Sequence, residues 1–169
     1  MENEDYRIIT LHDNKLKVYR EGRIEREFVY KYGSKDKKYK KGDIKWIDIV
    51  ALHKSTGYCV CYLFNESIRK QFRAHRIIAY TFLGLDIDNP TQIIDHIDRN
   101  KTNNNVVNLR IVTNQQNQFN TNSKGYTFAK NKYEARIFIS GKKIYLGYYK
   151  TEICARLAYL TAKSHYHQF

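Results

Sequence analysis

The sequence predicts an α+β protein built from two parts, and three patterns lead to this prediction. Residues 1–73 are rich in β-forming side chains, arranged in short runs with turn signals between them. Residues 92–120 follow the order strand, polar loop, strand and capped helix. Residues 126–166 follow the order of three strands and one helix. We expect this last segment to form a small three-stranded antiparallel sheet packed on its helix.

The two parts are expected to form separate domains. A chain of 169 residues suits one medium domain or two small ones, and 42% hydrophobic residues can form a core. The single proline and the lack of a long Gly/Ser linker imply that any joint is a short polar segment. We place the first domain at 1–121, with a β-rich lead-in at 1–73 and a core from about 74 to 121, and the second domain at 122–169.

Within the lead-in, short strands are expected over 6–32, 44–50 and 57–64. Residues 33–43 form a lysine-rich loop between them, for which a solvated connection is expected and a phosphate contact is the alternative. Residues 74–83 have the apolar spacing of a helix. The β-rich segment therefore leads directly into a helix.

Three side chains of this region are expected to pack instead of carrying chemistry. Cys59 and Cys61 lie two residues apart on a predicted strand and share one face, where small core residues are the expected use of two thiols. His75 begins the predicted helix and is expected to pack or hydrogen bond there. The three cysteines of the chain contain no C-x-x-C pair, which argues against a disulfide framework and a cysteine-based zinc site.

The sequence also restricts the location of the protein. No apolar run approaches the length of a membrane span, so no membrane partner is expected. The start, MENEDYR, is acidic and polar, unlike a secretory signal. Together with the cysteine usage, this predicts an intracellular, reducing compartment, such as the cytoplasm, nucleoid, nucleus or a virus-infected cell.

Charge and aromatic content indicate a polyanionic partner. The net charge is +13, and residues 121–169 contribute +7 of it through nine Lys/Arg against two acidic residues. The fifteen tyrosines and eight phenylalanines favour nucleic acid, because aromatic side chains among cations suit base stacking and phosphate contact. A basic protein without such a partner is the alternative.

One constellation near the middle of the chain has the composition of a hydrolytic metal site. Asp95 and His96 end a predicted strand, and Asn117 lies one turn into the helix that Thr113 caps in a Thr-x-x-Gln capping box. Carboxylate and amide oxygens suit a hard cation such as Mg²⁺ or Mn²⁺. A neutral imidazole beside the metal can take a proton from water if its other nitrogen is fixed, and the amide of Asn108 is a candidate for that role.

The carboxylate, the imidazole and the helix amide are expected to line one solvent-open cavity. Asp98, two residues from His96, is the second choice as a metal ligand. The remaining asparagines of this segment, Asn100 and Asn103–Asn105, are assigned to loop and turn geometry and to no chemical role.

The spacing of these residues resembles the HNH endonucleases, in the branch found in homing endonucleases. The resemblance implies a ββα-metal (His-Me finger) unit in which Asp95 binds the metal, His96 is the general base and Asn108 orients the histidine. Asn117 stands where the founding pattern has histidine, and is expected to complete the metal site. The family also implies 5′-phosphate and 3′-hydroxyl products.

The resemblance continues upstream of the motif. Residues 57–84, with the pair His75-Arg76, are similar to the strand and His-Arg helix that precede the motif in this branch. Residues 17–26 faintly resemble a small β-module that often comes before it.

The second domain resembles the DNA-binding domain of plant ethylene-response factors over 123–167. Alternation along its hairpin directs Ile144, Leu146 and Tyr148 toward the helix, together with the alanine and isoleucines of 133–139. The opposite face is expected to enter the major groove of duplex DNA through Arg136, Phe138, Lys143 and Tyr145. Three lysines in turns are expected to meet phosphates: Lys130, Lys132 and Lys142.

These observations predict a metal-dependent DNA endonuclease that nicks duplex DNA as a monomer, since one such site cuts one strand. Two alternatives stay open at this point. One is a non-catalytic, sequence-specific DNA-binding regulator, and the other is a dimeric, restriction-type nuclease that makes double-strand breaks.

Overall fold

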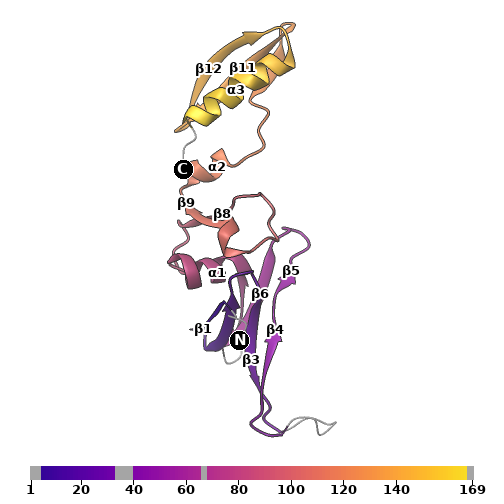
Figure 1. The fold of residues 1–169 in the computed structure, drawn as a ribbon, viewed down its shortest axis with the longest axis vertical. Coiled ribbons are helices and arrows are strands. Elements are labelled where there is room, and N and C mark those ends of the chain that lie inside the picture. Colours follow the sequence, from indigo (N-terminus) through magenta and orange to yellow (C-terminus); the bar gives the residue numbers. More distant parts are fainter. Residues whose placement is uncertain (1–4, 33–39, 66–67, 167–169) are drawn as a thin grey trace. The chain divides into compact units, whose positions relative to one another are not determined.

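The computed structural model describes residues 5–32, 40–65 and 68–166, so most of the lysine-rich loop at 33–43 lies outside the described residues. The chain divides into two compact units, Met1–Ile111 and Val112–Phe169 (Figure 1). The units divide before residue 121, where we placed the end of the first domain, and that boundary stays a prediction. The predicted α+β class is confirmed, because several small antiparallel sheets occur with few helices.

The first unit begins with a four-stranded antiparallel sheet in sequence order. Tight turns connect the first three strands, and His12 and Asp13 take positive φ values of 49° and 59° in the first of these turns. The register pairs Leu16 with Ile9 on one side and Arg26 on the other. The strands are β1 (Tyr6–Leu11), β2 (Asn14–Tyr19), β3 (Ile24–Val29) and β4 (Ile44–Asp48).

A second sheet leads into the first helix. Its strands are β5 (Ala51–Leu52), β6 (Cys59–Asn65) and β7 (Ile68–Arg73), followed at once by α1 (Ala74–Leu83). The helix presents Ile77 and Ile78, which are completely buried, to β2 and β6. The predicted helix over 74–83 is therefore confirmed.

The core of this unit joins both sheets to α1. Leu16 and Ile24 from the first sheet and Leu63 from the second are fully buried in one cluster with the helix. Cys61 belongs to the same cluster, and burial raises the pKa of its thiol to about 12, so it stays protonated. The prediction that Cys61 packs in the core is confirmed.

The strand–loop–strand segment forms a separate two-stranded sheet. It consists of β8 (Ile93–His96), the short 3₁₀ turn η1 (Val106–Asn108) and β9 (Leu109–Val112). Val106 and Leu109 anchor the segment in the core of the first unit. The loop between β8 and η1 carries the asparagines.

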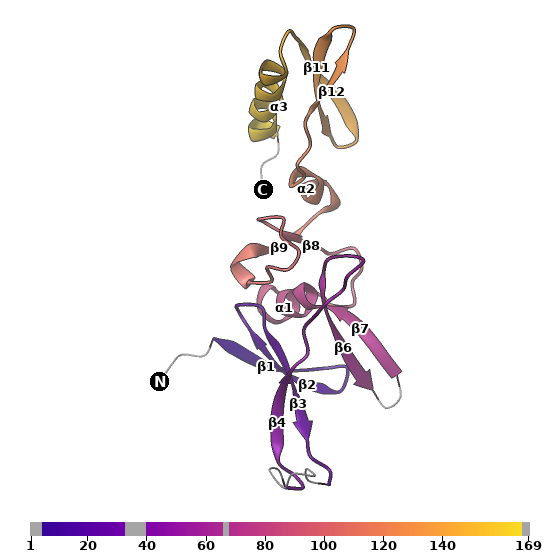
Figure 2. The same cartoon turned by 90° about the vertical axis from the view of Figure 1, so that its right-hand side faces the viewer.

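The second unit contains α2 (Asn114–Phe119) and a small sheet with one helix. Thr113 caps α2 in the predicted capping box, with its hydroxyl accepting from the backbone N–H of Gln116. The sheet has the order β10 (Tyr126–Ala129), β11 (Lys132–Ile139) and β12 (Lys142–Tyr149), and α3 (Glu152–Tyr166) covers one face (Figure 2). Ile137 and Tyr159 meet in its core, so the predicted sheet on one helix is confirmed.

The direction of one aromatic side chain differs from the prediction. The register between β11 and β12 shifts after Ala135, which pairs with Gly147, while Arg136 pairs with Tyr145. The extra residue, Leu146, is a β-bulge that reverses the alternation beyond it. Tyr148 consequently points away from the helix. It lies on the sheet face that α3 does not cover, here called the open face, with its ring centroid 5.5 Å from that of Tyr145.

Candidate functional site

The carboxylate of Asp95 lies at the end of β8 and is held by the neighbouring strand. Arg110 of β9 donates two hydrogen bonds to Oδ2 of Asp95, from Nε at 2.9 Å and from Nη2 at 2.7 Å. Asp95 is only 7% exposed. Strand pairing therefore places a fixed guanidinium against the proposed metal ligand, and the sequence reading did not foresee this pair.

His96 is the last residue of β8, and the residue is 5% exposed. Its Nε2 lies 3.1 Å from Oδ1 of Asn104, which is itself buried. An amide oxygen can only accept, so this contact requires a proton on Nε2 and leaves the lone pair of the neutral ring on Nδ1. Both Asp95 and His96 are nearly covered, and the expected solvent-open cavity that they share with Asn117 of the other unit stays a prediction.

Asn108 does not orient His96 directly, and that prediction is corrected by the structure. Its amide oxygen accepts from the backbone N–H of Asp98 at 3.0 Å. Its amide nitrogen donates to Oδ1 of Asp98 at 2.9 Å and to the backbone oxygen of Asn103 at 2.8 Å. The side chain emerges from η1 into the turn that follows β8, so it closes the loop instead of reaching the imidazole.

The asparagine loop is built from side-chain turns, as predicted for most of its members. The side-chain oxygens of Asn100, Asn103 and Asn105 each accept from a backbone N–H two residues later. Asn103 also donates to Asp98, and this hydrogen bond is the main reason that the pKa of Asp98 lies below its usual range. Asp98 is thus occupied by the loop, in keeping with its second rank as a metal ligand.

Asn104 is the functional candidate that the sequence reading missed. It lies in the middle of three consecutive asparagines and nothing in its local sequence distinguishes it from its neighbours. Only its position opposite His96 separates it from residues that make turns. Its role therefore becomes visible only when the residues in contact with His96 in the folded chain are known.

An aromatic cluster surrounds the other sides of His96. The ring of His75 meets that of His96 edge-on at 5.1 Å between centroids, and Tyr58 meets His75 at the same distance. Among the described residues, the buried Nδ1 of His75 has no hydrogen-bond partner. Burial, followed by the nearby His96, lowers the pKa of His75 to about 3, so its ring is neutral at pH 7. Its predicted packing role is confirmed.

Arg76, the second residue of the His75-Arg76 pair, holds the loop that connects α1 to β8. Arg76 donates to the backbone oxygens of Gln92, Ile87 and Asn89 at 2.9, 3.1 and 3.0 Å. These carbonyls belong to the connection between α1 and β8. The pair therefore has two structural roles. His75 packs its ring against His96, and Arg76 hydrogen bonds to the loop that precedes β8.

Asn117 belongs to the second unit, where it is an exposed residue of α2. Its backbone N–H continues the helix by donating to Thr113 at 2.9 Å. Asn117 thus lies about one turn into the helix that Thr113 caps, as the sequence predicted. Its proposed place in a metal site stays a prediction.

The donor chemistry of the proposed ligands fits a hard cation. A carboxylate from Asp95 and an amide oxygen from Asn117 are both ligands that Mg²⁺ and Mn²⁺ accept. Within the described ranges, no cluster of three or more His, Cys, Asp or Glu residues could hold a metal. Asp95 belongs to the first unit and Asn117 to the second, so their joint use as metal ligands stays a prediction.

The open face of the second unit's sheet carries the predicted DNA-contacting side chains. Phe138 and Tyr145 are 56% and 53% exposed there. Glu134, which the sequence reading left without a role, accepts from Lys143 at 2.7 Å, and Nη1 of Arg136 lies 3.9 Å from its Oε1. The hydrogen bond from Lys143 is the main reason that the pKa of Glu134 is lowered. The three predicted phosphate-contacting lysines are exposed: Lys130, Lys132 and Lys142.

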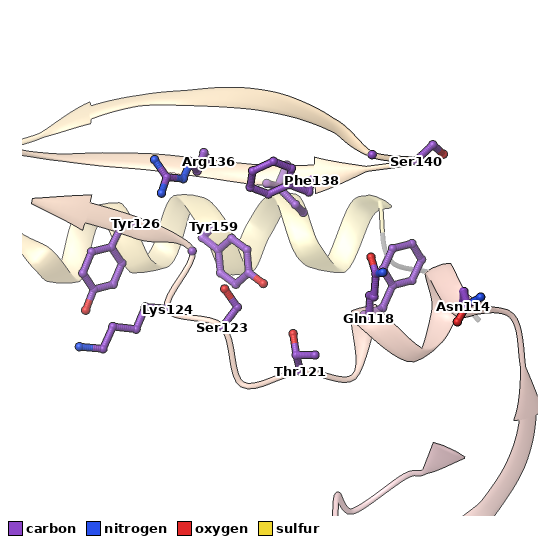
Figure 3. Close-up of a pocket in the computed structure, with 14 residues that line it drawn as sticks. Asn114, Gln118, Thr121, Ser123, Lys124, Tyr126, Arg136, Phe138, Ser140 and Tyr159 are labelled. Atoms are coloured by element: carbon purple, nitrogen blue, oxygen red, sulfur yellow. The ribbon is translucent and has the colours of Figure 1, made fainter. Parts of the chain in front are cut away.

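A cavity of about 700 Å³ lies beside β11 in the same unit (Figure 3). Arg136 and Phe138 line it on one side, and the chain from Thr121 to Tyr126 lines it on another. Gly125 is required at its wall, because a Cβ there would stand 1.9 Å from the ring of Tyr159. The cavity combines aromatic and cationic walls and contains neither Asp95 nor His96.

No helix in the described part of the chain has the length and apolar character needed to cross a membrane. The family described as HNH endonuclease matches residues 72–119, the segment that runs from the end of β7 through α2. This match contains Asp95, His96, Asn108 and Asn117. The motif and the family match therefore coincide.

Two relatives come from Acanthamoeba polyphaga mimivirus. The uncharacterized HNH endonuclease L245 is 35% identical over 83 residues, covering 46% of this chain and 24% of the relative. The uncharacterized HNH endonuclease L560 is 37% identical over 107 residues, covering 57% of this chain and 53% of the relative. The chain thus spans about a quarter and about half the length of these relatives.

One solved structure, described as DNA binding and cleavage by the HNH homing endonuclease I-HmuI, is also similar. It is 27% identical, with a TM-score of 0.40, and the match covers 64% of this chain and 55% of that one. The family that matches residues 72–119 and both viral relatives share the same description, HNH endonuclease. Together with the strand-borne Asp95-His96 pair, they support an HNH endonuclease domain in this chain.

Proposed function

We propose that the chain is a metal-dependent DNA endonuclease that hydrolyses a phosphodiester in duplex DNA and nicks it as a monomer. The observation that carries this proposal is the Asp95-His96 pair at the end of β8, inside the HNH endonuclease match. Nε2 of the imidazole hydrogen bonds to Asn104. This contact leaves Nδ1 as the nitrogen through which the imidazole would act as a base. The family and the relatives support a DNA nuclease.

His96 is the proposed general base. It takes a proton from the attacking water through Nδ1, while Nε2–H stays bonded to Asn104. Asn108 supports this step from a distance, since it ties the start of the loop to the backbone after His96. Proton transfer by a positioned side chain contributes roughly a hundredfold to ten-thousandfold in rate.

Asp95 is the proposed metal ligand of the first unit, and Arg110 orients its carboxylate. When bound, a divalent cation such as Mg²⁺ or Mn²⁺ would supply positive charge to the attacked phosphate and the departing 3′ oxygen. The proposal that Asn117 adds a second protein oxygen comes from the motif spacing, since α2 belongs to the other unit. By the same resemblance, the products would carry 5′-phosphate and 3′-hydroxyl ends.

The sheet of the second unit is the proposed DNA-contacting surface. Arg136 and Lys143 can donate to base edges, and Phe138 and Tyr145 present apolar rings beside them. The turn lysines Lys130, Lys132 and Lys142 are proposed to meet phosphates, which fixes position without reading sequence. Tyr148 joins this face because of the β-bulge.

A non-catalytic DNA-binding regulator is the second candidate, and a specific observation favours it. His96 and Asp95 are nearly covered, and Asp95 is paired with Arg110, as in a structural ion pair. In that case the polar groups around β8 would hold the fold together and the second unit would carry the activity. The two candidates differ in whether any phosphodiester is cut.

A plasmid assay separates the candidates. The intact chain is incubated with supercoiled plasmid in Mg²⁺ and in EDTA, and the relaxed form is followed. We expect metal-dependent nicking that falls by about a hundredfold or more in His96→Ala, with DNA binding retained. The matched control is His165→Ala, which removes an exposed imidazole from α3 and should cut like the unaltered chain. Nicking that survives His96→Ala, or that needs no metal, would contradict the proposal.

A further inference from the structure

The turn between β2 and β3 touches the asparagine loop beside His96. Gly22 in this turn has a φ of +112°, and a Cβ built on it would lie 3.1 Å from both the carbonyl carbon and the Cβ of Asn104. The backbone N–H of Val106 donates to the backbone oxygen of Arg20 at 2.8 Å. The turn therefore packs directly against the residue that contacts the imidazole.

The turn is itself a rigid support. The backbone N–H of Gly22 donates to Tyr19 at 3.1 Å, and the N–H of Tyr19 donates to Arg23 at 3.0 Å. On either side of it, Val18 and Ile24 are completely buried in the core of the unit. A displacement of the turn would disturb this core, so the turn is a fixed wall for the loop.

Asn104 lies between this wall and His96. Its residue exposure is 4% and its Oδ1 is 3.1 Å from Nε2 of His96. On the opposite side of the imidazole, His75 packs edge-on at 5.1 Å. The hydrogen bond to Asn104 and the packing of His75 and Tyr58 all act on the ring, and the hydrogen bond depends on the position of the loop.

We propose that Asn104 is a positioning residue for His96, and that the Gly22 turn of the N-terminal sheet holds Asn104 in place. The Gly22 turn then supports the site from a distance, because the amide that it holds sets which nitrogen of His96 carries the lone pair. The inference rests on the proposed role of His96 as general base. It adds that the base acts through Nδ1 only while Asn104 engages Nε2.

The tautomer of His96 tests the hydrogen bond without reference to activity. Ring ¹⁵N shifts of the intact chain are measured at a pH where the ring is neutral, and the His96 signals are identified by their loss in His96→Ala. We expect the Nε2–H form alone in the unaltered chain, a mixture of both neutral forms in Asn104→Ala, and the Nε2–H form again in Asn104→Asp, which retains an acceptor oxygen. An unchanged tautomer in Asn104→Ala, with the same melting temperature, would overturn the proposal.

The cleavage rate tests the consequence of this contact. The single-turnover nicking rate at saturating protein should fall by about tenfold in Asn104→Ala and recover in part in Asn104→Asp, while DNA affinity is unchanged. A rate within twofold of the unaltered chain would count against Asn104 as a positioning residue.

The wall is tested with a matched pair of glycines. Gly22→Ala and Gly42→Ala impose the same kind of backbone strain, since φ is +112° and +92°, but a Cβ at Gly42 has no atom within 4 Å. A shift of about 1 Å at a reacting group can cost a hundredfold in rate, so we expect about a threefold loss from the smaller shift in Gly22→Ala and none in Gly42→Ala. Equal rates in the two variants would remove the role of the turn.

These outcomes are separable from a failure of the proposed function. If the chain cuts no DNA but the His96 tautomer changes in Asn104→Ala, the positioning contact stands and the nuclease proposal fails. If the chain cuts DNA and the tautomer does not respond, the nuclease proposal stands and the positioning contact is wrong.

Discussion

Two ion pairs of equal length show how differently the two units use charge. Arg110 lies 2.7 Å from Asp95 in the first unit, and Lys143 lies 2.7 Å from Glu134 in the second. The side chains of the first pair are 24% and 8% exposed, whereas those of the second are 46% and 16% exposed. Distance alone therefore does not tell what a pair contributes, because water screens the second pair far more than the first.

The first unit builds a fixed polar site and the second presents an adjustable charged surface. Around His96, each asparagine of the loop is tied by its own side chain or by that of a neighbour. On the open sheet face, Lys143 and Arg136 share one carboxylate and can exchange it for phosphate or base edges. Fixed geometry suits proton transfer, and exchangeable pairs suit contact with a polyanion.

The largest expected effect breaks the buried pair. Arg110→Ala leaves the carboxylate of Asp95 without its guanidinium, and we expect the free energy of unfolding of the first unit to fall by about 3 kcal/mol. Trp46, the only tryptophan in the sequence, lies in β4 of that unit, so its fluorescence in a urea titration reports the loss. Lys143→Ala is the matched control on the exposed pair of the second unit, and it should leave the urea midpoint of that unit, followed by far-ultraviolet circular dichroism, unchanged. A loss below about 1 kcal/mol in Arg110→Ala would show that the two pairs are equivalent.

A smaller effect concerns the neutral imidazole that packs against His96. The pKa of His75 is lowered from its ordinary value of 6.5 to about 3, so the unfolded chain binds a proton between these values that the folded chain does not. Stability from this group is complete above pH 6.5 and is lost as the pH falls toward 3. At pH 5 the loss should reach about 2 kcal/mol, since one pH unit corresponds to about 1.4 kcal/mol.

His75→Phe isolates this contribution, because it retains a ring against Tyr58 and His96 but cannot titrate. The unfolding free energy of both proteins is followed by Trp46 fluorescence from pH 7.5 to pH 5. As the pH falls, the unaltered chain should lose stability relative to the variant. Parallel pH profiles for the two proteins would mean that the pKa of His75 is the same in the folded and the unfolded chain.

The smallest expected effect is on the exposed face. Glu134→Gln removes the carboxylate that Lys143 and Arg136 share, which frees two cations for DNA. We expect about a threefold gain in affinity for random duplex DNA at low salt and no gain at high salt. The reason is that Glu134 is a charge at the edge of the proposed interface, where salt screens its effect. Fluorescence anisotropy over a salt series measures both values. A gain that persists at high salt would show that Glu134 acts through a buried contact instead.

Much of the local structure was predictable from the sequence. The strands at 92–97 and 108–112, the capping box at Thr113 and the three strands and helix after residue 125 all follow patterns of period and turn chemistry. Such patterns depend on residues only a few positions apart, so they can be recognised without knowledge of the tertiary structure. The packing of Cys61 and His75 followed from the same reasoning.

The partners of the key side chains were not predictable in this way. Asn108 was assigned to His96, but Asn104 is the residue that makes the contact, and Arg110 was not connected with Asp95. Tyr148 was assigned to the wrong face because a single bulged residue reverses the alternation beyond it. Each of these differences arises from how a loop or strand pair closes, which local spacing does not specify.

The sequence by itself determined the elements, the caps and the chemical types available near His96: a carboxylate, an imidazole and a run of amides. Only the tertiary structure decided which amide meets the imidazole, how deeply the site is covered, and that a turn of the first sheet supports it. The physical reason is that identical asparagines differ only in position, and position is set by packing against residues more than eighty places earlier in the chain.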